Sequence, residues 1–510
     1  MRRSSSRIFV LVLVALGWGC AHYQVNPRLA AYDKKTGYRY DNLTQGDKPN
    51  SESLFVVLAF SGGGTRAAAL SYGVLEQIAK TNVWWEGRVR PLLSEVDVIS
   101  SVSGGSFTAA YYALFGDRIF RDFEGRFLKQ KIESRLIRNL FYPKNWVRLP
   151  SPYFNRIDMA AEIYDRDIFE HKTFADLIRK GTRPYLILNA TDMTLGARFE
   201  FTQDQFDPIC SDLAGVPIAR AVAASSAFPG LLSPLTLRSY AHDLPGGTGG
   251  IGGVGPSPCG YSLPGWFDNA LLDAQVNARR YSEAKTLAAY VKDPDKRFVH
   301  LLDGGISDNI GLRGPIRALT SNDSPWSLVN KENNGAIEKI VAITVNAKTR
   351  ATLHWDERER APWLVPALGA AATTPLDHYS FETVELLKQD VKQIEEEKRY
   401  LEACKNLLAK ECPAAKVPGQ PRYPDYYTIE VDFDSLADPG RRRYFQNLPT
   451  NFQLTPEQVD CLRSAGGNLL VQSPGFGKLL DDLDELARKA GAEPPPRPPP
   501  PAWPGPCGRQ

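Results

Sequence analysis

Continuous apolar runs that alternate with helical patterns mark the first part of the chain. Residues 54–60 form an unbroken apolar run, which is typical of a strand buried on both faces of a parallel sheet. A glycine turn follows, and residues 66–80 then repeat apolar side chains at helical spacing. The run at 96–99 predicts a second strand, and the Ala-rich stretch 106–114 predicts a second helix. This order predicts an α/β fold in which crossover helices join the strands of a mostly parallel sheet.

Later segments extend the predicted sheet. Apolar runs at 185–189, 298–302 and 340–345 predict further strands, and the alternation at 427–433 predicts an edge strand. Between them, residues 246–260 are rich in Gly and Pro, which predicts a surface loop that could serve as a lid or be a simple insertion.

A long charged helix is predicted at 381–408. Its apolar residues recur at near-heptad spacing, but Lys398 and Lys405 interrupt the stripe. The pattern therefore favours a helix packed along the domain surface over a dimeric coiled coil. Thr455, Pro456 and Gln458 predict the start of another helix through a capping box.

The N-terminus has the order of an export signal. Three arginines precede the apolar stretch 8–16, which is too short to span a bilayer comfortably. The following Gly17-Trp18-Gly19-Cys20 resembles a bacterial lipoprotein cleavage site, with Cys20 as the lipidated residue; plain secretion is the alternative. We divide the chain into a signal peptide (1–20), a polar tether (21–50), a main α/β domain (51–350), a C-terminal α+β extension with the long helix (351–490) and a disordered proline-rich tail (491–510).

Composition and charge narrow the possible partners. The chain has 510 residues, is 43% hydrophobic and carries a net charge of +3, which gives no case for a nucleic-acid partner. Six cysteines remain besides Cys20, and they allow 15 disulfide pairings. Cys404 and Cys412 would lie about 12 Å apart on an unbroken helix, beyond disulfide reach. The sequence contains no CxxC motif and no paired-His spacing, so it gives no indication of a metal site, and we expect no cofactor.

Ser103 is the strongest candidate for chemistry. It lies in Ser101-Val102-Ser103-Gly104-Gly105-Ser106, directly after the strand at 96–99 and before an Ala-rich helix. This is the layout of a nucleophile elbow, in which small residues let strand and helix pass closely and expose the serine hydroxyl. Ser101 stands where Gly is usual, so the elbow geometry at this residue needs checking.

The glycine turn at 61–66 has three possible identities. A P-loop would end in Gly-Lys-Ser/Thr, which this turn lacks. The spacing of Gly62, Gly64 and Ala67 fits a dinucleotide fingerprint, but Glu86 does not lie at a predicted strand end to hold the ribose. The third identity is an oxyanion hole, with Gly63 and Gly64 N–H groups stabilising a tetrahedral intermediate. The serine elbow one crossover later favours the third.

A nucleophilic serine also needs a base. None of the six histidines follows a strand at the expected edge, and His300 lies within a predicted strand. Asp303, where that strand ends in a glycine turn, is the better candidate, because burial can raise a carboxylate pKa toward that of a useful base. The alternative is that Asp303 only caps the turn through its own side chain.

Together these motifs resemble the patatin-like phospholipases. Ser61-Gly62-Gly63-Gly64-Thr65-Arg66, the elbow at Ser103 and Asp303-Gly304-Gly305 are similar to the three signatures of that family, in order, and the stretches 189–192 and 224–230 also match. The resemblance covers about residues 53–316 and implies a three-layer α/β/α sandwich.

The resemblance also implies roles for single residues. Ser103 would be the nucleophile, Asp303 the base, and Gly62, Gly63 and Gly64 the oxyanion hole. Arg66 would place a phosphate or brace the loop. We therefore expect a lipid acyl hydrolase with a Ser-Asp dyad, tethered to a bacterial cell-envelope membrane through Cys20. The competing hypothesis is a non-catalytic envelope lipoprotein that keeps the fold and binds lipid or a protein partner.

Overall fold

The computed structural model describes residues 21–43, 50–229, 232–243, 258–349, 359, 364–412 and 423–508. The predicted signal peptide with Cys20, and most of the predicted loop at 246–260, lie outside these residues. Among the described residues, no helix is both long and apolar enough to cross a membrane.

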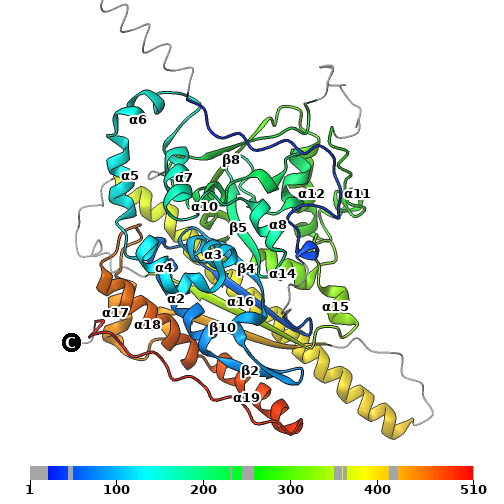
Figure 1. Cartoon of the computed structure of the whole chain (residues 1–510). Helices are drawn as coiled ribbons and strands as arrows, with labels where there is room; N and C mark the ends of the chain where they lie inside the picture. Colours follow the sequence, from blue (N-terminus) through cyan, green and yellow to red (C-terminus); the bar gives the residue numbers. More distant parts are fainter. Residues whose placement is uncertain are drawn as a thin grey trace, which may run out of the picture.

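A mixed, mostly parallel sheet forms the centre of the molecule (Figure 1). Strands β10, β9, β1, β4 and β5 lie side by side and run parallel, while β8 pairs antiparallel with β5, and β7 with β8. Every residue of β1, β4, β5 and β9 is buried, so both faces of these strands are covered, as the unbroken apolar run of β1 predicts for that strand. The strands of this sheet are β1 (Leu54–Phe60), β4 (Val96–Val102), β5 (Tyr185–Asp192), β6 (Arg198–Glu200), β7 (Leu235–Arg238), β8 (Phe298–Asp303), β9 (Lys339–Asn346) and β10 (Asp425–Asp432); β2 (Asn82–Trp85) and β3 (Arg88–Pro91) form a separate hairpin.

Helices connect and cover the strands. The crossover helices predicted after β1 and β4 are present, and the helix after Thr455 begins with the expected capping box. The helices are α2 (Gly64–Lys80), α3 (Gly104–Phe115), α4 (Ile119–Phe123), α5 (Ile132–Leu140), α6 (Pro143–Arg148), α7 (Arg156–Asp167), α8 (Phe174–Lys180), α9 (Gln203–Phe206), α10 (Ile218–Ser225), α11 (Phe267–Ala270), α12 (Ala278–Val291), α13 (Gly305–Asp308), α14 (Arg313–Thr320), α15 (Val329–Asn333), α16 (Leu364–Glu411), α17 (Pro439–Gln446), α18 (Pro456–Gln472) and α19 (Pro474–Lys489).

The C-terminal extension is built into the same sheet. Strand β10 pairs along its whole length with β9 and forms one edge of the sheet. Helix α18 packs against α2, where Arg463 forms an ion pair with Glu76. Helix α16 buries Val384, Leu387 and Val391 against the core, in agreement with a helix that lies on the domain surface.

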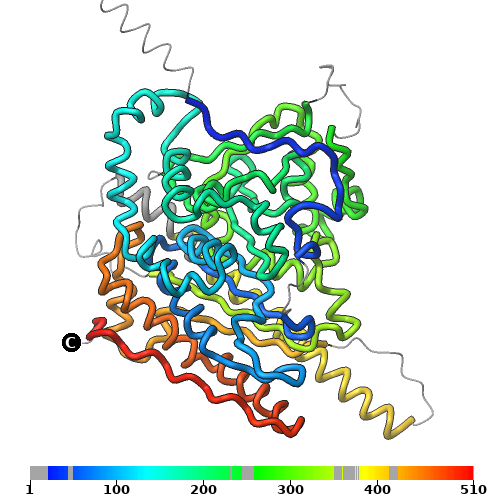
Figure 2. The backbone as a smooth tube through the Cα atoms, viewed as in Figure 1, coloured from blue at the N-terminus to red at the C-terminus, as the bar shows by residue number. Residues whose placement is uncertain are grey.

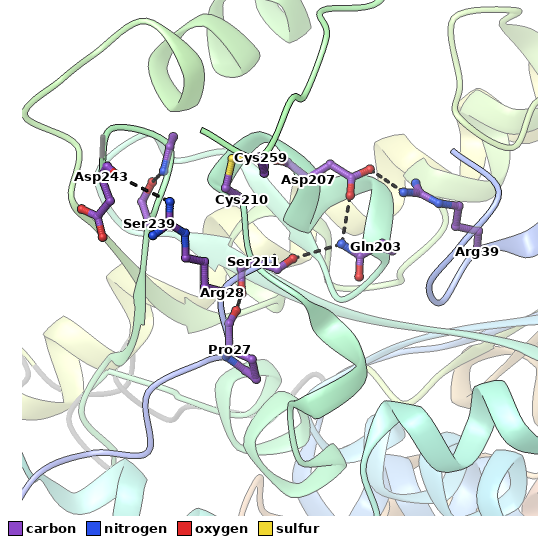
Figure 3. The surroundings of a disulfide bond; sticks show 11 residues. Pro27, Arg28, Arg39, Gln203, Asp207, Cys210, Ser211, Ser239, Asp243 and Cys259 are labelled. Carbon is purple, nitrogen blue, oxygen red and sulfur yellow. Dashed lines mark hydrogen bonds and ion pairs between the residues drawn. A yellow bond between two sulfur atoms is a disulfide. The ribbon is translucent and has the colours of Figure 1, made fainter. Parts of the chain in front are cut away.

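The segment predicted as a polar tether is instead packed on the domain over residues 21–43 (Figure 2). Tyr38 and Tyr40 are buried, and the Tyr38 hydroxyl accepts a hydrogen bond from the Leu186 N–H. Arg39 forms a buried ion pair with Asp207 beside the Cys210–Cys259 disulfide (Figure 3). Composition did not reveal this, because a few aromatic side chains are enough to hold an otherwise polar segment in place.

The proline-rich tail is extended, as predicted, but the prediction that it is disordered is wrong up to residue 508. It lies along α18, where Asn468 Nδ2 donates to the Pro501 carbonyl at 2.8 Å. Trp503 packs on Phe445, and a disulfide joins Cys507 to Cys461. A proline segment cannot form a core of its own, but its carbonyls can accept hydrogen bonds from a neighbouring helix. Cys404 on α16 and Cys412 directly after its end are free and exposed, and they do not bridge each other, as their spacing predicted.

Candidate active site

Three chain turns meet where β1, β4 and β8 end. Val102, the last residue of β4, pairs with Asn189 of β5, and Asp303, the last residue of β8, pairs with the next residue, Ala190. Because β8 runs antiparallel to β5, the ends of β4 and β8 approach each other from opposite directions. A Cβ on Gly304 would lie 2.2 Å from the Asn189 carbonyl oxygen, so only glycine lets this turn cross β5. The topology thereby brings Asp303 to Ser103, although 200 positions separate them in the sequence.

Ser103 has the strained backbone of an elbow. Its φ of 49° and ψ of −120° lie in a region that residues with a side chain rarely adopt. The next residue, Gly104, lies against the glycine turn, where an added Cβ would be 2.0 Å from the Gly64 carbonyl oxygen. Ser101 is buried within β4, and its hydroxyl reaches the Ile187 carbonyl at 3.5 Å, so the sheet accommodates this serine in place of glycine.

Asp303 is buried and makes two contacts through its carboxyl group. Its Oδ1 accepts a hydrogen bond from the Gly305 N–H at 2.8 Å, and the Ser103 side chain lies near enough to the carboxyl group to influence its pKa. Burial raises the pKa of Asp303 to about 6, and the Gly305 N–H and the Ser103 side chain oppose the rise. The side chain therefore both caps its turn and contacts Ser103, so the two alternatives for this residue are compatible.

The glycine turn offers fewer free donors than predicted. Gly62 donates its N–H to the Asn309 carbonyl at 3.0 Å, and Thr65 donates to the Asn451 carbonyl at 2.9 Å. Within the described contacts, this leaves the N–H groups of Gly63 and Gly64 for a ligand. Gly63 has a φ of 137°, which requires glycine. The assignment of Gly62 as a third donor therefore conflicts with its occupied N–H.

Arg66 braces the turn against the C-terminal extension. It is buried, and its guanidinium donates to the carbonyls of Ala347 and Leu448 and to the Thr450 hydroxyl. These contacts favour the bracing role over phosphate placement, because a phosphate would have to compete with three existing acceptors. Residues from the extension thus form part of the wall of the site.

Ser225, which sequence reasoning did not assign, connects the elbow to the Asp303 turn. Its Oγ accepts from the Ser103 N–H at 3.0 Å and lies 2.9 Å from the Ser106 Oγ, while its carbonyl accepts from the Gly304 N–H. It belongs to the stretch 224–230 that resembled the family, which was the one available signal. Asn309 and Asn451, whose carbonyls hold the glycine turn, carried no recognisable sequence signal.

His300 lies on the exposed side of β8, and its ring contacts the Thr236 hydroxyl at 3.1 Å. A histidine base would have to lie against the Ser103 side chain, whereas the group whose pKa this side chain lowers is the Asp303 carboxyl. The structure therefore gives no support to His300 as the base.

A family model described as patatin-like phospholipase matches residues 58–316, just over half of the chain. The chain belongs to the patatin-like phospholipase family. The match includes the glycine turn, the Ser103 elbow and the Asp303 turn, so all three motifs of this patatin-like protein fall within the family region.

Comparison with curated proteins gave no match. Among solved structures, human GIVD cytosolic phospholipase A2 matches with a TM-score of 0.30 and 14% identity, over 57% of this chain and 43% of that chain. The same phospholipase in complex with methyl gamma-linolenyl fluorophosphonate matches with a TM-score of 0.36 and 12% identity, over 89% of this chain and 63% of that chain. In both, the chain spans less than two thirds of the phospholipase's length.

Proposed function

We propose that this patatin-like protein hydrolyses acyl esters of phospholipids or lysophospholipids through a Ser103–Asp303 dyad. The observation that carries the proposal is the placement of the buried Asp303 carboxyl group and the Ser103 elbow at the facing ends of two strands, where the Ser103 side chain lies near enough to lower the pKa of Asp303. The family match supports the same reaction class, because patatin-like phospholipases are lipid acyl hydrolases.

The reaction would run in two stages. In the first, Asp303 takes the proton of the Ser103 hydroxyl while Oγ attacks the ester carbonyl, and the proton then passes to the leaving alcohol as the acyl-serine forms. In the second, Asp303 takes a proton from water while the water oxygen attacks the acyl-serine carbonyl, and the proton then passes from Asp303 to Ser103 Oγ as the acyl–oxygen bond breaks and the fatty acid leaves. A pKa near 6 suits this exchange, since the group is ionised at neutral pH and remains basic enough to accept a proton.

The N–H groups of Gly63 and Gly64 would stabilise the oxyanion of each tetrahedral intermediate. They stand at the start of α2, whose dipole favours negative charge, and Gly64 lies against the elbow residue Gly104. Arg66 would hold this turn rigid from behind, so that the two donors keep their direction during the reaction.

The proposal places the enzyme at a bacterial cell envelope, anchored by lipid on Cys20. The basic and apolar residues of 1–16 and the residues around Cys20 support it. Metabolic labelling with palmitate tests the anchor: incorporation should be lost in Cys20→Ala, and equal incorporation in that variant would contradict it.

Two variants test the dyad. Ser103→Ala and Asp303→Asn should abolish p-nitrophenyl butyrate hydrolysis, and Ser103→Ala should also lose labelling by a fluorophosphonate probe. Asp303→Asn keeps an oxygen that can accept from Gly305, so its fold should survive. Asp308→Asn is a matched control, because this buried carboxylate accepts from the N–H groups of Gly311 and Arg313. Full activity in either dyad variant, or a wild-type protein inert to the probe, would refute the proposal.

A further inference from the structure

Exposed apolar side chains gather on one small part of the molecule. Of eighteen exposed large apolar side chains among the described residues, six lie within residues 137–153. We call this surface the α5–α6 face; its members are Ile137, Phe141, Tyr142, Trp146, Val147 and Tyr153. Phe141 and Trp146 are 68% and 63% exposed, which is unusual for aromatic side chains. Exposed apolar side chains gathered in one short segment are typical of a place where a molecule meets another apolar body.

The face belongs to a firmly packed part of the fold. Helix α5 buries Ile132 and Leu136, and α6 buries Asn145, whose amide donates to the Asn139 carbonyl at 2.7 Å. Arg148 lies over the Phe154 ring at 3.8 Å. The aromatic side chains are therefore presented outward by anchored helices, which project at the edge of the molecule (Figure 1).

The charged residues within the segment 134–157 are all basic. Residues 134–157 contain five Arg or Lys and no Asp or Glu. Arg135 and Arg148 pair with acidic residues of α7, while Arg138 and Lys144 are exposed beside the apolar side chains. Exposed aromatics flanked by basic residues suit a bilayer surface, where Trp and Tyr prefer the headgroup level and Lys and Arg attract anionic lipids.

The apolar N-terminal stretch joins the described structure at this face. Residues 1–20 carry the apolar run 8–16 and Cys20, and they connect to Ala21. The Ala21 carbonyl accepts from the Ser151 hydroxyl at 2.7 Å, and the Tyr23 N–H donates to the Tyr153 carbonyl. Figure 2 shows the described chain beginning beside α6. Any membrane attachment made through residues 1–20 would therefore hold this face next to the bilayer.

The other end of α5 reaches the candidate active site. The Ser134 hydroxyl donates to Gln453 Oε1, and the Glu133 N–H reaches the Phe452 carbonyl. The neighbouring Asn451 carbonyl accepts from Thr65 in the glycine turn. Helix α5 has nine residues, a length of about 13 Å, so the face lies roughly one short helix from the wall of the site.

We propose that the α5–α6 face is a docking surface for a bilayer with anionic headgroups. Docking inserts Phe141 and Trp146 into the interface and sets Arg138 and Lys144 against the headgroups. This orients the molecule so that a lipid leaving the bilayer enters the site along α5. Only this last step rests on the proposed hydrolase function; the docking itself does not require catalysis.

The first test measures binding without turnover. Full-length protein carrying Ser103→Ala is mixed with vesicles of phosphatidylcholine and phosphatidylglycerol in equal parts, and bound protein is separated by flotation. Adding Phe141→Ser and Trp146→Ser should lower the partition coefficient about 10- to 100-fold, since each tenfold corresponds to about 1.4 kcal/mol. Tyr400→Ser with Leu407→Ser is the matched control: these side chains are equally exposed on α16 and should not affect binding.

The second test reports on the face even if residues 1–20 dominate binding. Brominated phosphatidylcholine quenches tryptophans that enter the bilayer, and the difference in fluorescence between the parent and Trp146→Phe isolates Trp146. This Trp146 fluorescence should be quenched on vesicles. If the protein is bound but the Trp146 fluorescence is not quenched, the proposal is overturned. It is also overturned if a face variant binds vesicles like its parent but changes from dimer to monomer, because the face would then be the contact with a second copy.

Turnover separates this proposal from the proposed function. Hydrolysis of p-nitrophenyl butyrate in free solution checks the site of each variant without a bilayer. If all forms with an intact Ser103 are inactive while Trp146 is still quenched, the hydrolase assignment fails and the docking surface stands. If hydrolysis is normal but Trp146 stays unquenched, the docking surface fails alone.

Discussion

Ser225 offers a sharp test of how the nucleophile is held. This serine is fully buried at the last position of α10, and its Oγ accepts from the Ser103 N–H at 3.0 Å. Because it contacts the backbone of Ser103, the proposed nucleophile, and no reacting atom, we regard it as a positioning residue. We predict that Ser225→Ala lowers kcat for p-nitrophenyl butyrate roughly ten- to hundredfold, with little change in KM.

The magnitude follows from the elbow geometry. Removing the hydroxyl leaves the buried Ser103 N–H without its partner, at a cost of about 1–3 kcal/mol. The positive-φ backbone of Ser103 stores roughly 1–3 kcal/mol of strain. The free energy lost with the hydrogen bond is therefore comparable to the strain that this bond opposes. If the elbow relaxes, the hydroxyl moves away from Asp303. Since about 1.4 kcal/mol corresponds to a tenfold change in rate, we expect kcat of the Ser225→Ala variant to fall roughly ten- to hundredfold.

The neighbouring residue provides a matched control. Ser226 is equally buried, but its hydroxyl donates to the carbonyls of Val222 and Ala223 in its own helix. Ser226→Ala should keep kcat near the wild-type value, and urea unfolding should give the stability of both variants. Wild-type kcat in Ser225→Ala, with a stability loss similar to that of the control, would refute the positioning role.

Three further predictions concern the site and the tail. Because Asp303 must be ionised to accept the Ser103 proton and its pKa is raised to about 6, kcat/KM should fall as pH drops through about 6; an acid limb near 3.8, the ordinary value, would contradict this. The same raised pKa should make the free energy of unfolding decrease as pH rises from about 4 to 6, since the native state holds the proton more tightly than the unfolded chain. Replacing Cys461 and Cys507 together by Ser should lower the free energy of unfolding by about 2–4 kcal/mol, because the disulfide closes a loop of 46 residues. Replacing the free Cys404 and Cys412 is the control, and equal urea midpoints for both pairs would speak against a structural role for the disulfide.

The candidate site was predictable to the extent that its parts are local. A strand, a tight turn and the start of a helix are contiguous in sequence, so the glycine turn, the Ser103 elbow and the Asp303 turn could each be recognised. The carbonyl that occupies the Gly62 N–H could not, because it belongs to Asn309, about 250 positions away. Backbone carbonyls carry no residue-specific signal, so no pattern reveals which of them will satisfy a distant donor.

The two terminal segments show the limits of composition. Residues 21–50 were predicted to be a tether because they are polar and turn-rich, and the proline tail was predicted to be disordered because it cannot form a core alone. Both are nevertheless ordered over the residues that the structure describes, since Tyr38 and Trp503 pack on surfaces supplied by the rest of the chain. These segments are ordered because they pack against the folded domain. Their own composition does not specify the surface on which they pack.

The sequence by itself determined the candidate residues of the site and the order of the elements, because residue type and local spacing decide what each turn can do. Only the tertiary structure decided which groups act together: the contact of Asp303 with Ser103, the bracing of Arg66 by the C-terminal extension, and the pairing of Cys210 with Cys259 and of Cys461 with Cys507. Each of these depends on contacts between residues far apart in the sequence, which form when the sheet assembles and which no local pattern encodes.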